Sequence, residues 1–391
     1  MRHTNIGEMK VIAWYLPQFH EIPENNEWWG TGFTEWVNVK KAKPLEEGHN
    51  QPRIPLNDRY YDLSDVSVQK WQIETAKKYG VYGFCMHHYW FDGKLLLEKP
   101  IEQYLKNKGL DFPFCICWAN EHWTNRWIAG NEKILIEQKY GNKKEWKDHF
   151  EYLLPFFRDE RYIRIDGKPF MVIYRPELID CINEMLDYWQ KLAKMSGLPG
   201  ITFAYQGMKW DFVKNKDDSR FSYDIEYQPL VCWNGERQKN LSVRIQDKIP
   251  KCMLTFFSRP LNVIREMLLR QENKKKSVRE YEEVWKSVVE YKPVSEKSVP
   301  GAFVDWDNTP RKGVHGTYLR GANPEIFRKY FEIQVKRARE VYHKDFMFVF
   351  SWNEWAEGGY LEPDQKNQYG YLEAIRDTLD FLNERENVNK I

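Results

Sequence analysis

Long hydrophobic runs are missing from this sequence. No apolar stretch approaches the roughly 20 residues that a helix needs to span a bilayer, so we expect no transmembrane segment. Residues 1–10 are polar and contain no apolar core of a secretory signal. We therefore expect a cytoplasmic protein, with a signal removed ahead of the given start as the alternative.

An excess of one charge is also missing. The net charge is +2, from 59 Lys and Arg against 57 Asp and Glu. This balance gives no reason to expect nucleic acid or an anionic membrane as a partner. The chain likewise has no metal-binding spacing of Cys, His, Asp or Glu, and no glycine-rich phosphate loop follows any predicted strand. We expect no metal and no other cofactor, and we expect the cysteines to be buried reduced thiols. They are Cys85, Cys115, Cys117, Cys181, Cys232 and Cys252.

Eight short apolar runs of β-type residues alternate with helical patterns. They lie at residues 11–15, 82–87, 114–118, 170–174, 201–206, 223–227, 302–306 and 346–352. Nearly continuous apolar runs are typical of parallel strands that helices cover on both faces. The order predicts the α/β class, with a single (β/α)₈ TIM barrel over residues 1–391. An open doubly wound sheet is the alternative.

Helical spacing and loop length complete the predicted architecture. Apolar residues recur at helical spacing in residues 146–157 and 372–382, and Pro176 and Pro324 stand near helix starts. Ser277 with Glu280 resembles a capping box that opens a helix through Trp285. The connections after strands one and six, residues 17–62 and 228–276, are unusually long, which is typical of functional or mobile loops.

Two glutamates follow the eighth predicted strand, where a barrel of this kind places catalytic groups. Glu354 and Glu357 stand three residues apart. Breaking a glycosidic bond takes two carboxyl groups, one that protonates the leaving oxygen and one that acts as base or nucleophile. Burial beside Trp352 and Trp355 would raise the pKa of at least one glutamate, which suits a proton donor near neutral pH. The alternative is an ion pair with an arginine, namely Arg126, Arg175 or Arg311.

Aromatic residues are what the chain has in excess: they make up 16% of it, and 17 are tryptophans. Eleven tryptophans stand at predicted strand ends or in the loop after strand one. Flat amphipathic rings beside carboxylates and amides suit sugars, which have apolar C–H faces and hydroxyl rims. Packing at the barrel mouth is the alternative for many of the rings. The eleven are Trp14, Trp28, Trp29, Trp36, Trp90, Trp118, Trp123, Trp127, Trp306, Trp352 and Trp355.

From these positions we predict Glu354 and Glu357 as catalytic residues. The predicted substrate contacts are Trp14, Trp36, Glu35, His88, Tyr89, Trp118, Asn120, Glu121, Tyr174, Asp307, Trp352, Asn353 and Trp355. His87 and His88 point to opposite faces of their strand, so only one can easily reach the site. The segment from Asp305 to Asp307 matches the D-x-D pattern of metal-dependent nucleotide-sugar transferases, but a barrel strand end is the wrong context for that motif.

Several motifs, spread over nearly the whole chain, carry a resemblance to known families. They are A-W-Y-L-P-Q-F-H at residues 13–20, W-W-G at 28–30, G-F-T-E-W at 32–36, H-Y-W-F at 88–91, C-W-A-N-E at 117–121, W-D-N-T-P at 306–310 and W-N-E-W-A-E-G at 352–358. Together they resemble the WbsX-like family, whose members occur in bacterial clusters for O-antigen, capsule and other surface polysaccharides and are labelled glycosyltransferases. The last motif also resembles the N-E-W-x-E-G segment of glycoside hydrolase family 99, the endo-α-mannosidases and endo-mannanases.

The second resemblance implies a (β/α)₈ barrel and a retaining mechanism. In that family the first motif glutamate assists the sugar's own 2-hydroxyl as nucleophile, through an anhydro-sugar intermediate, and the second is the general acid/base. Carried over, Glu354 takes the first role and Glu357 the second. Retaining enzymes hold their carboxyl groups about 5–5.5 Å apart and inverting enzymes about 6.5–9.5 Å apart, which the sequence leaves open.

Three functions therefore stand side by side. A glycoside hydrolase or transglycosylase acting on a bacterial oligo- or polysaccharide is favoured by the barrel, the glutamate pair and the missing nucleotide loop. A glycosyltransferase of lipopolysaccharide or capsule biosynthesis is favoured by the family label and the expected location. A glycan-binding protein without catalysis is the third. Enzymes of polysaccharide assembly are the expected protein partners.

Overall fold

The computed structural model describes residues 8–125, 133–207, 217–233 and 278–388. Most of the predicted long connection at 228–276 lies outside these residues, as do Arg126, Trp127, Cys252 and Ser277. Within the described segments, no helix combines the length and the apolar composition that a membrane span requires.

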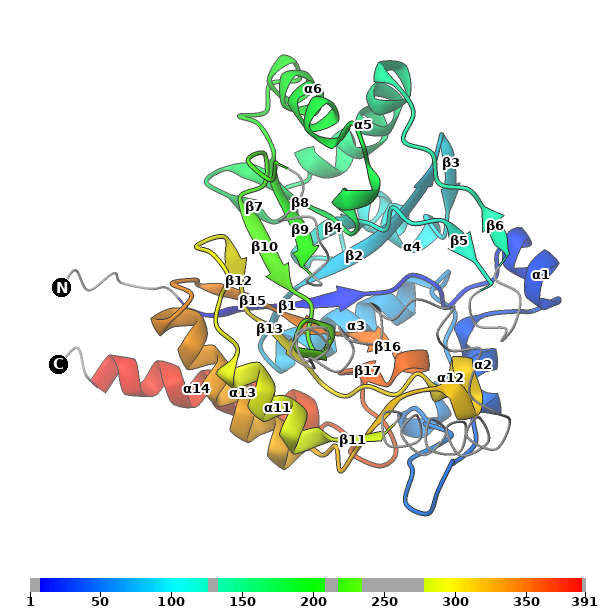
Figure 1. Ribbon diagram of the computed structural model, residues 1–391, viewed down its shortest axis with the longest axis vertical. Helices are drawn as coiled ribbons and strands as arrows, with labels where there is room; N and C mark the ends of the chain where they lie inside the picture. Colours follow the sequence, from blue (N-terminus) through cyan, green and yellow to red (C-terminus); the bar gives the residue numbers. More distant parts are fainter. Residues whose placement is uncertain (1–7, 126–132, 208–216, 234–277, 389–391) are drawn as a thin grey trace, which may run out of the picture.

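A ring of parallel strands forms the centre of the molecule (Figure 1). In sheet order the strands are β12 (Ser298–Val299), β10 (Tyr223–Glu226), β9 (Thr202–Gly207), β8 (Lys168–Ile173), β4 (Phe114–Trp118), β2 (Val81–Phe91), β1 (Lys10–Tyr15), β15 (Phe346–Phe350) and β13 (Gly301–Phe303). β12 pairs with β10 and β13 pairs with β15, and only Pro300 separates β12 from β13. These two pieces act as one strand that joins both ends of the sheet. The predicted barrel is confirmed, and the open sheet is wrong.

All eight predicted strands are present, and their ends differ for local reasons. β2 continues to Phe91 because its last residues leave the ring and pair with the antiparallel β3 (Lys94–Leu96). β13 and β15 end at Phe303 and Phe350, earlier than expected. The residues that follow them turn across the mouth of the barrel, where they build the site described below.

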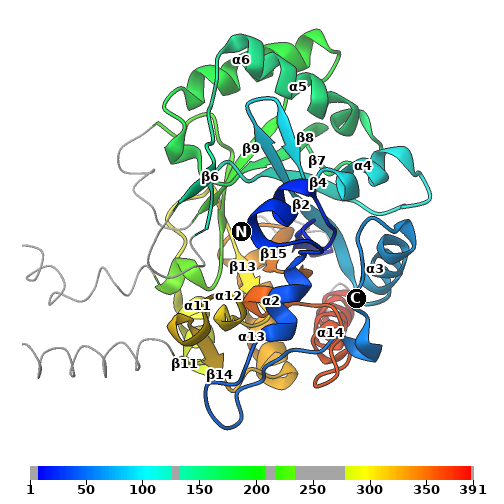
Figure 2. The same ribbon diagram turned by 90° about the vertical axis from the view of Figure 1, so that its right-hand side faces the viewer.

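Helices surround the strands, as Figure 2 shows from the mouth of the barrel. They are α3 (Val66–Lys78), α4 (Lys99–Lys106), α5 (Lys143–Arg158), α6 (Ile182–Met195), α11 (Tyr281–Glu290), α13 (Pro324–Glu340) and α14 (Gly370–Val388). The helices expected at 146–157 and 372–382 are confirmed in α5 and α14, and Pro176 and Pro324 do begin helical turns. The capping box is wrong. Glu280 ends the short strand β11 (Val278–Glu280) and stands directly before α11, without a side-chain cap.

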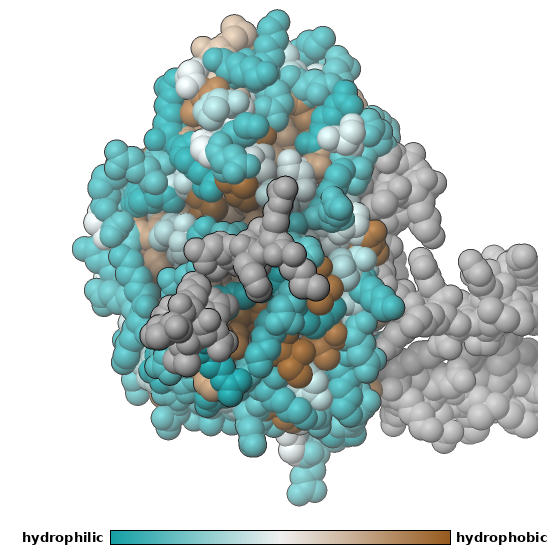
Figure 3. Space-filling view, turned by 90° about the vertical axis from the view of Figure 1, so that its left-hand side faces the viewer, coloured by the Kyte–Doolittle hydropathy of each residue, from teal (hydrophilic) through white to brown (hydrophobic). Residues whose placement is uncertain are grey.

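The interior of the barrel below its mouth is a packed aromatic core. Near the entry of the strands, the rings of Phe170, Tyr223 and Phe346 contact one another at centroid distances of 5.3 to 6.0 Å. One layer higher, Trp14 packs against Phe348 at 4.9 Å. Figure 3 looks onto the side where β1 enters, where hydrophilic residues predominate on the surface. Such a core leaves the opposite, C-terminal end of the barrel for a site.

The long loop after β1 covers part of that C-terminal end. It contains α1 (Pro23–Trp29), α2 (Glu35–Lys41) and a single turn, η1 (Leu56–Asp58). α1, α2 and α12 (Thr309–Lys312) lie on the side to which β1 points (Figure 1). The long loop predicted after the first strand therefore lies at the mouth of the barrel.

Candidate active site

The end of strand eight is fastened to the end of strand one. After β15 the chain forms β16 (Asn353–Glu354), the turn η5 (Trp355–Glu357) and β17 (Gly359–Tyr360). The side-chain oxygen of Asn353 accepts a hydrogen bond from the Leu16 N–H at 2.8 Å, and its amide nitrogen donates to the Leu16 carbonyl at 2.9 Å. Asn353, a predicted substrate contact, is fully buried, and its amide binds backbone at both ends. It holds Glu354 at the barrel mouth.

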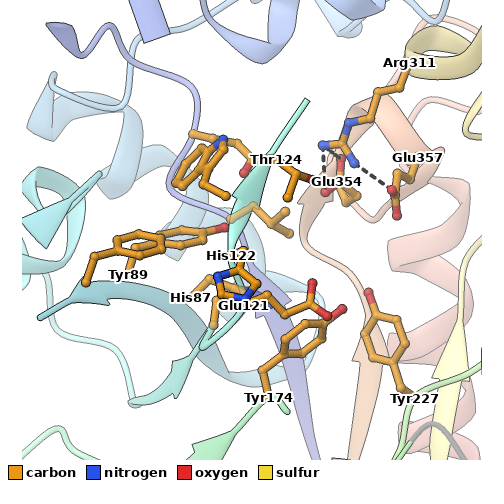
Figure 4. A pocket seen from close by; sticks show the side chains of 15 residues that line it. His87, Tyr89, Glu121, His122, Thr124, Tyr174, Tyr227, Arg311, Glu354 and Glu357 are labelled. Atoms are coloured by element: carbon orange, nitrogen blue, oxygen red, sulfur yellow. Dashed lines mark hydrogen bonds and ion pairs between the residues drawn. The ribbon is translucent and has the colours of Figure 1, made fainter. Parts of the chain in front are cut away.

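One arginine joins three carboxylates at the mouth. Figure 4 shows it with two of them, Glu354 and Glu357. Arg311 Nη1 donates to Glu357 Oε1 at 2.7 Å, and Nη2 donates to Glu354 Oε1 at 3.0 Å. Its Nε donates to Glu35 Oε2, on α2, at 3.3 Å. The side chains of Arg311, Glu354 and Glu35 are only 6%, 4% and 4% exposed, whereas that of Glu357 is 22% exposed. Of these three glutamates, Glu357 is therefore the one that solvent or a ligand reaches most easily.

The ion pairs proposed as the alternative role of the two glutamates do form, and Arg311 makes both of them. Arg175 pairs instead with Glu121. Pairing with Arg311 does not remove either glutamate from the site, because Glu354, Glu357 and Arg311 all line the same pocket.

Burial gives Glu354 an unusual affinity for its proton. Removal from water raises the pKa of Glu354 to about 8, Arg311 opposes this rise, and the nearby Glu357 and Glu35 add to it. When all three neighbouring carboxyl groups are ionised they repel one another, so full ionisation of the cluster is costly. One carboxyl group of the cluster therefore keeps a proton near neutral pH, and the raised pKa of Glu354 assigns that proton to this residue.

Asp307 holds the segment that carries Arg311. Its Oδ1 accepts from the Thr309 N–H and Oγ1 at 3.0 and 2.6 Å, at the start of α12. Its Oδ2 accepts from His49 Nε2 at 2.8 Å and Gln51 Nε2 at 2.6 Å. Although burial opposes ionisation, these bonds and the charge of Arg53 lower the pKa of Asp307 to about 2. The Asp307 N–H also donates to the Glu357 carbonyl at 2.6 Å, so this buried residue positions the site without lining the pocket.

The other carboxylate of the D-x-D match, that of Asp305, also accepts hydrogen bonds from donors of the protein itself. Asp305 Oδ2 accepts from Arg53 at 2.7 Å, and Oδ1 accepts from the Trp306 N–H at 2.7 Å. Both carboxylates thus bind protein donors. In the described part of the chain, no group of three or more His, Cys, Asp or Glu side chains is arranged to hold a metal ion.

A pocket of about 300 Å³ opens beside Glu354 and Glu357. Its size is at the lower end of that of small-molecule sites. Of the residues predicted from the sequence, five line it: Tyr89, Glu121, Tyr174, Glu354 and Glu357. The remaining lining residues are Leu16, Gln18, His87, Phe91, Ala119, His122, Trp123, Thr124, Tyr227 and Arg311. Strands and loops from all around the barrel mouth therefore meet at the glutamate pair.

All five predicted tryptophan contacts lie in the packed interior instead. Trp352 is fully buried against Phe84, with ring centroids 5.0 Å apart. Trp355 stacks on Tyr360 at 3.7 Å and donates its Nε1–H to Glu362 at 2.7 Å. Trp14, Trp36 and Trp118 are also buried and do not line the pocket. For these rings the alternative interpretation, packing at the barrel mouth, is therefore correct, because aromatic side chains fill the space beneath the mouth.

His87, rather than His88, faces the pocket. Successive residues of a strand point to opposite faces, and His88 turns outward, where its Nε2 lies 2.9 Å from Nε2 of His149 on α5. The inward-facing His87 places Nδ1 3.3 Å from the Tyr15 carbonyl. Only a protonated Nδ1 can donate there, which leaves Nε2 as an acceptor. Burial lowers the pKa of His87 to about 4, so this ring is neutral at physiological pH.

The corner after β4 supports one wall of the pocket. Asn120 is buried, and its amide exchanges two hydrogen bonds of 2.7 Å with the backbone of Arg175. Arg175 in turn pairs with Glu121, which lines the pocket beside Tyr174. The predicted contacts of this corner thus divide into Glu121 at the pocket and Asn120 behind it.

The lining residues that the sequence analysis did not predict fall into two groups. Gln18, His87 and Arg311 stand at predicted strand ends, and Tyr227 directly follows β10, so the strand-end rule could have found all four. His122, Trp123 and Thr124 come instead from the small hairpin of β5 (Trp123–Thr124) and β6 (Ile134–Ile136). No periodic pattern marks such a short hairpin in the sequence.

A closed parallel (β/α)₈ barrel with an acidic, aromatic pocket at its C-terminal mouth is the class that this fold and site define. Known structures share the fold. The GH99 endo-alpha-mannosidase from Bacteroides thetaiotaomicron superposes with a TM-score of 0.53 at 13% identity, over 97% of this chain and 98% of its own. A glycoside hydrolase-like protein gives a TM-score of 0.55 at 10% identity, over 97% and 96%.

The sequence identifies the family. Residues 11–375 match the family described as Glycosyltransferase WbsX, and the chain belongs to it. The uncharacterized protein WxcX, from two strains of Xanthomonas campestris pv. campestris, is 33% identical over 373 residues, or 94% of this chain. The match takes in 49% of WxcX, so the chain spans about half the length of these relatives. The resemblance to the WbsX-like family is confirmed.

Proposed function

We propose that this chain is the catalytic barrel of a carbohydrate-active enzyme that cleaves or transfers glycosidic bonds in bacterial surface polysaccharide. The observation that carries the proposal is the pocket in which Glu354 and Glu357 meet, joined through Arg311. A glycosidic bond breaks when one carboxyl group donates a proton while another group supports the opposite face of the sugar. The pocket offers both groups beside Tyr89, Tyr174 and Trp123, whose rings suit a sugar.

The two glutamates differ in a way that supports separate roles. Glu354 is the more deeply buried and holds its proton to a pKa of about 8, so its carboxylate is the stronger base. A strong base suits removal of a proton from a sugar hydroxyl, the role that the glycoside hydrolase family 99 motif assigns to it. Glu357 is more exposed, as a donor to a departing oxygen must be. We assign Glu354 as the base and Glu357 as the acid of a retaining reaction.

Hydrolysis or transglycosylation is our first choice, and transfer from a nucleotide sugar is the second candidate. The fold shared with an endo-alpha-mannosidase supports the first. The family's description as a glycosyltransferase supports the second. Within the described residues, the D-x-D carboxylates bind Arg53 and backbone, which favours the first choice. A cytoplasmic location and enzymes of O-antigen or capsule assembly as partners remain predictions.

Titration calorimetry separates these candidates. The probes are a panel of nucleotide sugars and a panel of α-mannosides and bacterial polysaccharide fragments. We expect binding only to the second panel, followed by release of a shorter glycan that chromatography detects. Tight binding of a nucleotide sugar would overturn our first choice. Glycan binding with no product at any pH would indicate a binding protein.

A further inference from the structure

His87 presents an unused nitrogen atom to the candidate active site. It lines the pocket beside Glu354 and Glu357 and keeps 8% of its surface exposed. Its Nδ1 donates to the Tyr15 carbonyl at 3.3 Å, which leaves a lone pair on Nε2. No residue in the described part of the chain hydrogen-bonds to Nε2, and this atom is not one of those that the fold seals off. A ligand in the pocket can therefore reach it.

Two contacts fix the direction of the His87 ring. The bond to the Tyr15 backbone holds one edge, and the ring packs on Trp14 with their centroids 5.8 Å apart. Trp14 is 1% exposed and belongs to the packed core, so it gives the histidine a rigid support. Because burial lowers the pKa of His87 to about 4, the ring is neutral and Nε2 is an acceptor only. This acceptor is in place before a ligand arrives, which limits the entropy lost on binding.

The same indole links His87 to the carboxylates. Trp14 also supports Tyr227, whose ring centroid lies 5.8 Å from its own. Tyr227 lines the pocket as well, and Figure 4 shows it extending toward Glu357. Burial is the main cause of the raised pKa of Tyr227, and the charge of Glu357 adds to it. A sugar unit that contacts the glutamate pair therefore shares a pocket of about 300 Å³ with His87.

We infer that His87 is a substrate-binding residue whose Nε2 accepts a hydrogen bond from a free hydroxyl group of the sugar in this pocket. A neutral imidazole nitrogen with a lone pair needs a donor, and hydroxyl groups are the commonest donors on a sugar. A carboxylate, or a hydroxyl that carries a methyl or acetyl group, has no proton to donate and would leave Nε2 unpaired. The inference rests on the proposed function and adds a substrate class to it: a sugar unit that is unsubstituted at the position facing His87.

The test pairs a change in the protein with a change in the sugar. His87→Phe keeps a flat ring on Trp14 but removes Nε2, so we expect roughly tenfold weaker affinity for the best-bound oligosaccharide of the panel. One monodeoxy analogue of that oligosaccharide should bind the wild type about tenfold more weakly than the parent sugar does, yet bind His87→Phe equally well. His87→Gln, which can place a carboxamide oxygen near the former Nε2, should recover most of the affinity.

The neighbouring histidine provides a matched control. His88 faces away from the pocket, and its Nε2 lies 2.9 Å from Nε2 of His149. His88→Phe removes this buried contact, so we expect a lower melting temperature and an unchanged affinity for the oligosaccharide.

The outcomes separate this inference from the proposed function. If His87→Phe binds the oligosaccharide as tightly as the wild type, or if the wild type binds every monodeoxy analogue as tightly as the parent sugar, the inference is wrong and the proposed function stands. If His87→Phe does not fold, His87→Leu takes its place in the comparison. If the wild type binds no glycan of the panel, the proposed function fails and the inference fails with it.

Discussion

At the scale of single residues, the site depends on one guanidinium that serves three carboxylates. If all four groups were charged, Arg311 with Glu35, Glu354 and Glu357 would leave a buried excess of negative charge. Burying an uncompensated charge is expensive, and a carboxyl group avoids the cost by keeping its proton. Glu354, which is buried more deeply than Glu357, is the carboxyl group whose pKa burial raises to about 8. The proton on Glu354 therefore follows from the number of charges around Arg311.

Removal of one of these charges should shift the pH dependence of catalysis. Glu35→Gln deletes a negative charge that raises the pKa of Glu354 and frees Arg311 to bind Glu354 more closely, so both effects lower that pKa. The reaction needs Glu354 ionised as the base and Glu357 protonated as the acid, so the pair must keep one proton between them. Activity therefore falls as pH rises past about 8, where that proton is lost, and the variant's falling limb should move to lower pH. A shift of roughly one pH unit corresponds to about 1.4 kcal/mol.

The measurement is kcat/KM against pH for the wild type and for Glu35→Gln. Glu121→Gln, which removes a carboxylate of the same pocket paired with Arg175, is the control and should shift the limb less. A limb that stays in place or moves to higher pH in Glu35→Gln contradicts this account of the cluster.

Two tryptophans should respond oppositely to truncation. Trp123 is half-buried and lines the pocket, whereas Trp352 is fully buried in the core. We expect Trp123→Ala to weaken oligosaccharide binding by about tenfold with a small change in stability. We expect Trp352→Ala to cost about 3–5 kcal/mol of unfolding free energy, because it opens a cavity in the core. Calorimetric affinity and urea denaturation of both variants check this, and a stability loss in Trp123→Ala as large as that in Trp352→Ala would show that both rings are structural.

At the scale of elements, the sequence predicts strands well and side-chain direction poorly. Each of the eight apolar runs is a strand, because a strand covered on both faces must be apolar throughout. That same uniformity hides which face of the strand looks inward. The rings of Trp118 and Trp352 therefore seemed available to a substrate, although the core takes both of them. His88 shows the same error by one residue, since the neighbouring His87 faces the pocket.

The glutamate pair could be found from sequence because it follows strand eight directly. Its partner Arg311 could not be ranked above Arg126 or Arg175, because the partner is chosen by the path of the chain after β13. Asp307 is the clearest example of a role that depends on the path of the chain after β13. It appeared in the sequence as a substrate contact, yet its hydrogen bonds with Thr309 and with the Glu357 backbone place α12 against η5.

The contact between Asp307 and η5 should depend on a glycine. Gly358 ends η5 with a φ of +72°, and a Cβ at this position would lie 2.9 Å from the Asp307 nitrogen. Gly358→Ala adds this clash to the cost of a left-handed backbone, so we expect a loss of more than about 1 kcal/mol in stability and a large fall in activity. Gly321→Ala is the matched control, with a φ of +83° and no atom within 4 Å of the added Cβ.

The difference between the two alanine variants isolates the contact with Asp307. Thermal melting measures the loss of stability of each variant, and kcat on a cleaved glycan measures its loss of activity. Equal losses in Gly358→Ala and Gly321→Ala would mean that only backbone conformation matters and that Asp307 does not hold Glu357 in place.

At the scale of the whole molecule, the barrel carries several buried carboxyl groups that keep their protons. Burial raises the pKa of Glu226 to about 8, and those of Asp224 and Glu362 to about 7, besides that of Glu354. An unfolded chain would release these protons near pH 4. Between about pH 4 and 8 the native state therefore binds more protons than the unfolded state, and the free energy of unfolding falls as pH rises through this window.

We expect the chain to be most stable near pH 4 and to lose stability steadily toward pH 8, by about 1.4 kcal/mol for each proton and pH unit. Asp307, whose pKa is lowered to about 2, has the opposite effect, but only below about pH 4. Urea denaturation at pH 5, 6.5 and 8 measures the slope. Glu226→Gln removes one of the titrating groups and should make the slope shallower. Stability that is constant or increases from pH 5 to 8 contradicts the protonated state of these carboxyls.

The central claim is that Glu354 and Glu357 carry out glycosidic chemistry in this pocket, and the turnover of a bound glycan by Glu357→Gln tests it most directly. The exposed Glu325→Gln on α13 serves as the control for a lost carboxylate elsewhere. We predict that Glu357→Gln still binds the glycan but turns it over at least about 10²-fold more slowly than the wild type, while Glu325→Gln keeps the wild-type rate. Full activity in Glu357→Gln would contradict the account.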